Sequence, residues 1–92
     1  MKEQFIRTGM LLGEDAVDKL SGKHVAVYGI GGVGSFCAEA LARAGIGHLT
    51  LIDDDTVSVS NLNRQLIALH STIGMPKVEA AKRRILDIDP TI

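Results

Sequence analysis

The chain has 92 residues, 46% of them hydrophobic, and a formal net charge of −1 from ten basic and eleven acidic residues. This length allows one domain at most, and the composition excludes a disordered chain. The balanced charge gives no sign of a strongly basic nucleic-acid-binding domain. The single cysteine, Cys37, excludes a disulfide framework and a multi-cysteine metal site. Because no apolar run approaches the ~20 residues of a membrane span and no signal peptide is evident, we expect a cytoplasmic protein.

The first half of the chain predicts helix, strand, glycine turn and helix. Residues 1–22 carry a weak helical pattern. Residues 23–28 form a short run that is apolar on both faces, which is typical of a parallel strand covered on both sides. Residues 29–34 are a glycine-rich turn, and residues 35–44 predict a helix. We expect its buried stripe to consist of Phe36, Ala40, Leu41 and Ala44, and we expect Cys37 to be a small buried residue.

The second half predicts another strand and a final helix. Residues 48–53 are a second short apolar run, and residues 54–74 are polar and irregular. Pro76 suits the first position of a helix, whose apolar spacing continues to Pro90. A strand–helix–strand unit implies a right-handed crossover and parallel strands. We therefore predict an α/β fold, a Rossmann-like β-α-β unit with an N-terminal and a C-terminal helix, and an incomplete sheet because two strands are too few.

The strongest motif is the run Gly29-Ile30-Gly31-Gly32-Val33-Gly34, which matches G-x-G-x-x-G between a predicted strand and a predicted helix. The first glycine permits a tight turn, the second lets the backbone approach a phosphate, and the third lets helix and strand pack closely. The helix N-terminus beyond the turn attracts anions. A turn without a ligand is the alternative. The candidate nucleotide-binding glycines are Gly29, Gly31, Gly32 and Gly34.

Asp53 ends the second predicted strand, and Asp54 and Asp55 follow it directly. A carboxylate at Asp53 is placed to accept the two ribose hydroxyls of a nucleotide, although it would also suit a solvated turn. Asp55 is aligned with Asp53 if the strand continues, so it is a second candidate nucleotide-binding residue. Asp54 is expected to point away into solvent.

Two cations follow in the long loop and at the start of the last helix. Arg64 and Lys77 are expected to converge on the carboxyl ends of the strands, where ligands bind in open α/β sheets. Two cations there suit a triphosphate, because they neutralise charge that develops on a leaving pyrophosphate. Each would otherwise be an ordinary surface charge. No Walker A sequence is present, so ATP would bind through the Rossmann-type turn.

Four motifs together resemble one superfamily. GIGGVGS, LIDDDTV, NLNRQ and GMPKVE, in this order and at these spacings, are similar to the ThiF/MoeB/E1-like adenylating superfamily, over residues 7–90. The resemblance implies that Asp53 holds the ATP ribose. It also implies that Arg7 reaches across a homodimer interface towards the phosphates of the other subunit. The implied nucleotide and phosphate cluster consists of Asn61, Arg64, Gln65 and Lys77.

Two segments, RTGMLLGEDAVDKL and IALHSTIGMPKVE, resemble the tRNA threonylcarbamoyladenosine dehydratase branch of that superfamily. This resemblance implies ATP-dependent activation of the threonylcarbamoyl carboxylate at tRNA position 37, followed by ring closure. An alternative branch adenylates the C-terminal glycine of a ubiquitin-like sulfur-carrier protein. Two further alternatives are an NAD-dependent oxidoreductase and a fragment that only folds or dimerises.

The extent of the chain departs from the superfamily. The resemblance implies a Mg²⁺ ligand and substrate-recognition segments beyond residue 92, and no metal ligand within residues 1–92. We therefore expect residues 1–92 to be the N-terminal half of an ATP-binding adenylating domain, inactive by themselves.

Overall fold

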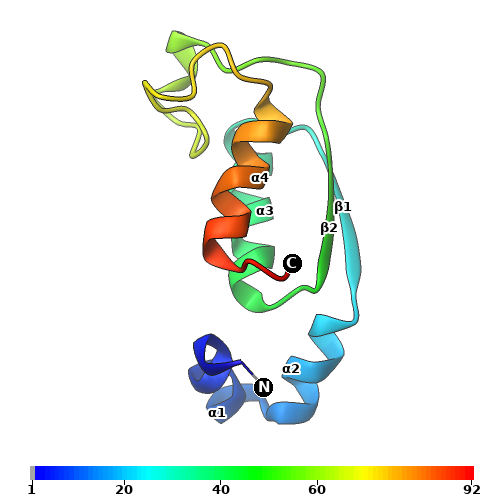
Figure 1. Cartoon of the computed structure of the whole chain (residues 1–92). Helices are drawn as coiled ribbons and strands as arrows, with labels where there is room; N and C mark the ends of the chain where they lie inside the picture. Colours follow the sequence, from blue (N-terminus) through cyan, green and yellow to red (C-terminus); the bar gives the residue numbers. More distant parts are fainter. Residues whose placement is uncertain (1) are drawn as a thin grey trace.

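The computed structural model describes residues 2–92. A helical N-terminal segment leads into a β-α-β unit, a long loop and a final helix (Figure 1). The Rossmann-like α/β prediction is confirmed. The elements are η1 (Glu3–Phe5), α1 (Ile6–Leu12), α2 (Glu14–Ser21), β1 (His24–Tyr28), α3 (Gly32–Ala44), β2 (His48–Ile52), η2 (Val59–Asn61) and α4 (Lys77–Ile88).

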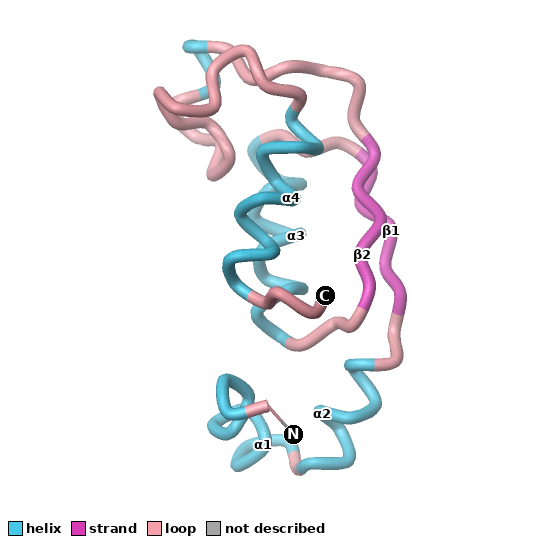
Figure 2. The backbone as a smooth tube through the Cα atoms, in the orientation of Figure 1, coloured by secondary structure: helices cyan, strands magenta, loops and turns pink. Residues whose placement is uncertain are grey.

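The sheet consists of β1 and β2, which pair in parallel with their ends flush: His24 lies opposite His48, and Tyr28 lies opposite Ile52. The crossover helix α3 contacts β1, and α4 contacts β2. Both helices cover the same face of the sheet, and the long loop lies at the end where the strands finish (Figure 2). This arrangement brings the glycine turn after β1, the residues after β2 and the start of α4 to one end of the molecule.

The core lies between the covered sheet face, the two helices and the long loop. Ile30 and Ala42 are completely buried, and Val57 is 2% exposed. Ala38 and Ala42 allow α3 to approach the sheet closely, because neither has a side chain beyond Cβ. Burial of apolar surface in this cluster is the main contribution to the stability of the fold.

Two predictions about the core are wrong. Residues 23–28 are covered on one face only: Tyr28 is 79% exposed, because no described residue packs on the face opposite α3 and α4. The predicted stripe of α3 is wrong at Phe36, which is 56% exposed, although Leu41 does pack against the core, and the expectation that Cys37 is buried is also wrong. The fully buried α3 positions are Ser35, Ala38 and Ala42. The close approach of α3 to the sheet requires small side chains, which displaces the larger ones outward.

The ends of several elements also differ from the sequence prediction. The N-terminal helical segment is divided at Gly13, whose φ is +92°. Pro76 precedes α4 as its N-cap instead of being its first residue. Gly45, with φ +100°, ends α3 as a left-handed C-cap, as its glycine predicts. Among residues 2–92, no helix is both long and apolar enough to cross a membrane.

Candidate functional site

The turn between β1 and α3 depends on glycine at both of its ends. Gly29 has φ +87°, a left-handed conformation that other residues rarely adopt. A Cβ added to Gly34 would lie 1.7 Å from the carbonyl oxygen of Gly29, so the first turn of α3 touches the end of β1 directly. These two constraints fold the backbone tightly and direct the N-terminus of α3 to the carboxyl end of the sheet.

Asp53, directly after β2, joins the ends of the two strands. Its Oδ2 accepts a hydrogen bond from the Ile30 N–H at 2.6 Å, and its Oδ1 accepts one from the Asp55 N–H at 2.7 Å. Burial would raise the pKa of Asp53, but the two N–H donors and the positive charge of Lys77 outweigh it and lower the pKa. Asp53 is therefore a carboxylate held against the glycine turn.

The start of α4 is fixed beside Asp53 by backbone hydrogen bonds. The backbone carbonyl of Asp55 accepts a hydrogen bond from the Lys77 N–H at 3.0 Å. The Val57 N–H donates to the Met75 carbonyl, and the Val57 carbonyl accepts from the Gly74 N–H, both at 2.8 Å. These bonds join the chain after β2 to the chain before α4. The Lys77 side chain is buried, with 8% of the residue exposed. The structure thus holds a buried cation within electrostatic reach of Asp53.

Two residues of the long loop lie against the glycine turn. Gln65 Nε2 is 3.7 Å from the position that a Cβ on Gly31 would take, and Arg64 Cγ is 3.8 Å from the corresponding position on Gly32. Arg64 is exposed, and its Nη1 donates to Ser60 O and Asn63 Oδ1. The loop therefore brings the Gln65 amide and the aliphatic part of Arg64 against the predicted phosphate-binding backbone, while Ser60 and Asn63 hold the Arg64 guanidinium.

Asn61 stabilises the start of the long loop through a capping box. Its Oδ1 accepts from the Ser58 N–H at 2.9 Å in a capping box, and the residue is 8% exposed. Its amide oxygen thus holds the loop that carries Arg64 and Gln65.

The three adjacent acidic side chains lie close together. The carboxylate oxygens of Asp53, Asp54 and Asp55 are within 4.8 Å of one another, a spacing at which a metal ion could be held. Each oxygen of Asp53 already accepts one backbone N–H and keeps a further lone pair. Asp53 can therefore accept additional donors while it holds the glycine turn.

Arg7 is the predicted site residue that the structure does not bring to this cluster. It belongs to α1, which lies at the end of the molecule opposite the long loop (Figure 1). Within one chain, Arg7 therefore stands apart from Asp53 and Lys77.

Ser35 is a site candidate that the sequence analysis did not identify. It follows Gly34 in the first turn of α3 and is 3% exposed. Its hydroxyl and Gln65 Oε1 are buried without a hydrogen-bond partner among the described residues. A serine directly after the glycine motif was the available signal. Buried polar atoms normally have a hydrogen-bond partner, so these two atoms indicate a position beside the turn where a ligand group or a water molecule would bind.

The assembled groups suit an anionic ligand. The turn and the N-terminus of α3 offer backbone N–H donors, Asp53 offers a carboxylate, and Arg64 and Lys77 offer positive charge. Comparison with known sequences identifies the family: residues 5–92 match the profile of the ThiF family. The chain belongs to the ThiF family.

Individual relatives of this ThiF-family chain have similar sequences over most of its length. The tRNA threonylcarbamoyladenosine dehydratase of Bacillus subtilis is 52% identical over 90 residues, which are 98% of this chain and 35% of the relative. The molybdopterin-synthase adenylyltransferase of Haemophilus influenzae is 45% identical over 78 residues, which are 85% of this chain and 32% of the relative. The ThiF-family chain thus spans about a third of the length of each of these two relatives.

Solved structures show the same fold. The crystal structure of Escherichia coli tRNA N6-threonylcarbamoyladenosine dehydratase in complex with ATP matches with a TM-score of 0.94 and 49% identity, over 97% of this chain and 37% of that one. The two-stranded sheet of the ThiF-family chain therefore corresponds to part of a larger protein in this relative.

Proposed function

We propose that this chain binds ATP and takes part in the adenylation of a carboxylate. The observation that carries the proposal is the meeting of a glycine turn, the Asp53 carboxylate and the Lys77 cation at one end of the sheet. The similarity to a structure in complex with ATP supports it. In the bound state, the turn and the N-terminus of α3 hold the phosphates, and Asp53 accepts the ribose hydroxyls.

The cations give this site its chemistry. An oxygen of the substrate carboxylate attacks the α-phosphorus, a new P–O bond forms, and the bond to pyrophosphate breaks. Arg64 and Lys77 stabilise the negative charge on the five-coordinate phosphorus and on the departing pyrophosphate. The carboxylate itself is the nucleophile, so the step requires no nucleophilic side chain.

We propose the threonylcarbamoyl group of tRNA as the substrate. Relatives of this name from Bacillus subtilis and Escherichia coli are 52% and 49% identical to the chain. After adenylation, an internal nucleophile of the threonylcarbamoyl group displaces AMP and closes a ring, with net loss of water. A tRNA substrate fits a cytoplasmic location.

We propose that residues 1–92 are the N-terminal half of a longer ATP-binding adenylating domain. The chain covers about a third of its relatives. In addition, a groove of about 540 Å³ separates the free edge of β2 from α4, and its apolar lining includes Leu51, Val78 and Ile85. A further parallel strand would fill this groove and pair with β2. We also propose that the protein ligand of a Mg²⁺ ion, which would supply positive charge to the phosphates, lies outside residues 1–92.

We further propose that the protein is a homodimer in which Arg7 of one copy reaches the phosphates bound by the other. The distance of α1 from its own site supports an action on a second copy (Figure 1). So does the exposed apolar surface of α1, where Met10 is 81% and Leu11 is 84% exposed and no residue is buried. In this arrangement, Arg7 adds a third cation to the phosphate cluster.

Pyrophosphate exchange in the full-length protein tests the adenylation step. Arg64→Ala and Lys77→Ala should each slow the exchange of labelled pyrophosphate into ATP by about 100-fold or more, because each removes charge stabilisation of the transition state. Arg83→Ala, an exposed position on the same helix that lies outside the groove between β2 and α4 and pairs with Glu79, is the matched control and should keep the wild-type rate. Wild-type exchange by both site variants would refute the assignment.

Mixing inactive variants tests the dimer. Equal amounts of Arg7→Ala and Lys77→Ala protein, allowed to exchange subunits, should recover about a quarter of wild-type exchange, because half of the dimers then contain one intact site of two. No recovery despite proven subunit exchange would exclude a role for Arg7 on a second copy.

A second candidate substrate is the C-terminal glycine of a ubiquitin-like sulfur-carrier protein. The 45% identity to molybdopterin-synthase adenylyltransferases favours it over other carboxylates. Exchange stimulated by tRNA that carries threonylcarbamoyladenosine, and not by a carrier ending in Gly-Gly, would select the first candidate. Tight NADH binding without competition by ATP would instead indicate an oxidoreductase. An unchanged melting temperature in millimolar Mg-ATP would indicate a chain that does not bind the nucleotide.

A further inference from the structure

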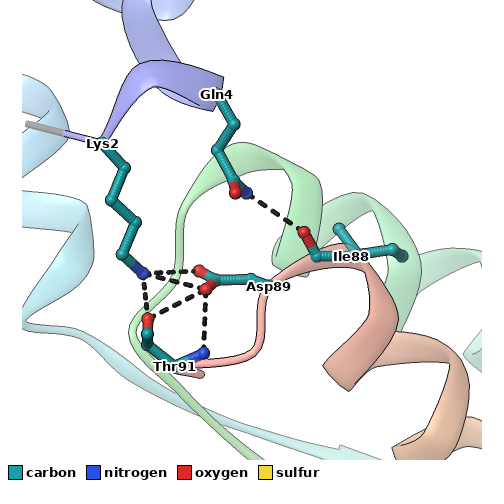
Figure 3. A network of polar contacts seen from close by, with 5 residues as sticks. All are labelled: Lys2, Gln4, Ile88, Asp89 and Thr91. Carbon is teal, nitrogen blue, oxygen red and sulfur yellow. Dashed lines mark hydrogen bonds and ion pairs between the residues drawn. The ribbon is translucent and has the colours of Figure 1, made fainter.

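The segment before α1 is tied to the last residues of the chain (Figure 3). Lys2 Nζ lies 2.9 and 3.0 Å from the two carboxylate oxygens of Asp89 and also donates to Thr91 Oγ1. Beside this ion pair, Gln4 Nε2 donates to the Ile88 carbonyl at 3.3 Å. The contacts join residues that are 84 to 89 positions apart in the sequence.

Asp89 is well suited to be a fixed anchor. Its side chain is 5% exposed, it follows the last residue of α4, and its Oδ1 also accepts the Thr91 N–H at 3.0 Å. Burial would raise the pKa of Asp89, but the hydrogen bonds from Lys2 and Thr91 outweigh it and lower the pKa. A buried carboxylate that stays charged depends on its cation, so removal of Lys2 leaves Asp89 without a counter-charge.

The helix that follows has no anchor of its own. None of the residues of α1 is buried, so packing on the core does not set its direction. Its direction depends on its two neighbours, η1 and α2, both of which contact it. Phe5, the last residue of η1, is 6% exposed and lies against Gly45, where an added Cβ would be 3.4 Å from Phe5 Cε1. Lys2, Gln4 and Phe5 therefore hold the start of α1.

We propose that the Lys2–Asp89 ion pair is a positioning contact for Arg7. Arg7 is the second residue of α1, only two positions after Phe5, so its place follows that of η1. When the ion pair is broken, η1 loses its charged contact with the end of α4 and keeps only the Gln4–Ile88 hydrogen bond and the packing of Phe5, so α1 with Arg7 is held less firmly in one direction. This inference rests on the proposed role of Arg7 at the phosphates of a second copy. Lys2 and Asp89 act through Arg7 and touch no reacting atom.

Coupling between two variants distinguishes positioning from a general loss of stability. In the full-length protein, Lys2→Gln should lower kcat/KM for ATP in pyrophosphate exchange by about tenfold, because a displaced catalytic group loses its alignment. The double variant with Arg7→Ala should be no slower than Arg7→Ala alone, since the ion pair acts only through Arg7. Lys2→Arg, which keeps the charge, should restore the rate. Lys23→Gln, an exposed lysine without a described side-chain bond, is the matched control and should leave it unchanged.

Limited digestion with trypsin measures the attachment of η1 and α1 independently of catalysis. Cleavage after Arg7 should be at least about fivefold faster in Lys2→Gln and in Asp89→Asn than in the wild type, because local unfolding of α1 lets its backbone enter the protease. Equal cleavage rates, or losses of exchange that multiply in the double variant, would overturn the inference. If the wild type itself showed no pyrophosphate exchange, the proposed function would fail. Equal trypsin cleavage of the wild type and the variants would separately refute the claim that the Lys2–Asp89 ion pair holds η1 and α1 in place.

Discussion

Gly34→Ala is a sharp test of the turn, because the structure predicts a clash with backbone. The new Cβ would lie 1.7 Å from the Gly29 oxygen and 2.8 Å from the Gly29 carbonyl carbon, so α3 must move away from the end of β1. Forcing extra atoms into a packed site costs typically 1–3 kcal/mol, and contact with backbone falls at the upper end, about 3 kcal/mol. For a chain of 150–250 residues, this lowers Tm by about 6–12 °C.

Gly32→Ala is the matched control two residues away. Its Cβ would meet only the flexible Arg64 side chain, with Cγ at 3.8 Å and Cδ at 4.0 Å, both ordinary contact distances, and its φ is not positive. We expect its free energy of unfolding to stay within about 0.5 kcal/mol of the wild type. Thermal unfolding of the full-length protein, followed by circular dichroism without nucleotide, measures both variants.

Gly34→Ala also tests the link between the turn and the ligand. Because α3 must shift in Gly34→Ala, its N-terminal N–H groups no longer meet the phosphates, and the rise of Tm in Mg-ATP should disappear. Equal melting of Gly34→Ala and wild type, or equal destabilisation by Gly32→Ala, would refute the argument that the close contact of Gly34 with Gly29 determines the turn.

Three further perturbations give separate expectations. Asp53→Asn should weaken ATP binding by about tenfold or more in calorimetry, because the amide keeps one acceptor for two N–H donors and loses the charge. Phe5→Ala should cost about 3 kcal/mol in denaturant unfolding, because it empties a buried aromatic site. The hydrogen bond from Arg84 is the largest influence on Glu39 and, despite burial, holds its pKa below the ordinary value of 4.5. Stability from Glu39 is therefore fully present above about pH 4.5 and is lost as pH falls through the lowered pKa, so Glu39→Gln should flatten the fall of Tm between about pH 5 and 3.

The sequence predicts the elements that carry local signals. The run at 23–28, the glycines and the run at 48–53 each have a pattern, and the right-handed crossover rule then yields the parallel pair. The same reasoning predicts that Asp53 and Lys77 approach the turn, because loops at the carboxyl ends of parallel strands share one edge of the sheet.

Other features depend on relations that no local pattern contains. The face of α3 that turns inward is decided by the contact of Gly34 with Gly29, which selects Ala38 and Ala42 over the larger Phe36. Hydrophobicity alone favoured Phe36. Likewise, nothing in the neighbourhood of Lys2 indicates a partner 87 positions away.

The bond between Asp53 and the Ile30 N–H has a consequence for the energetics of binding. It joins the residue after β2 directly to the backbone of the glycine turn, so the end of β2 holds the turn in its folded shape. A loop that is ordered in advance loses little conformational entropy when a nucleotide arrives, which leaves more of the contact energy for affinity. Disruption of this single bond should therefore change the entropy of association more than its enthalpy.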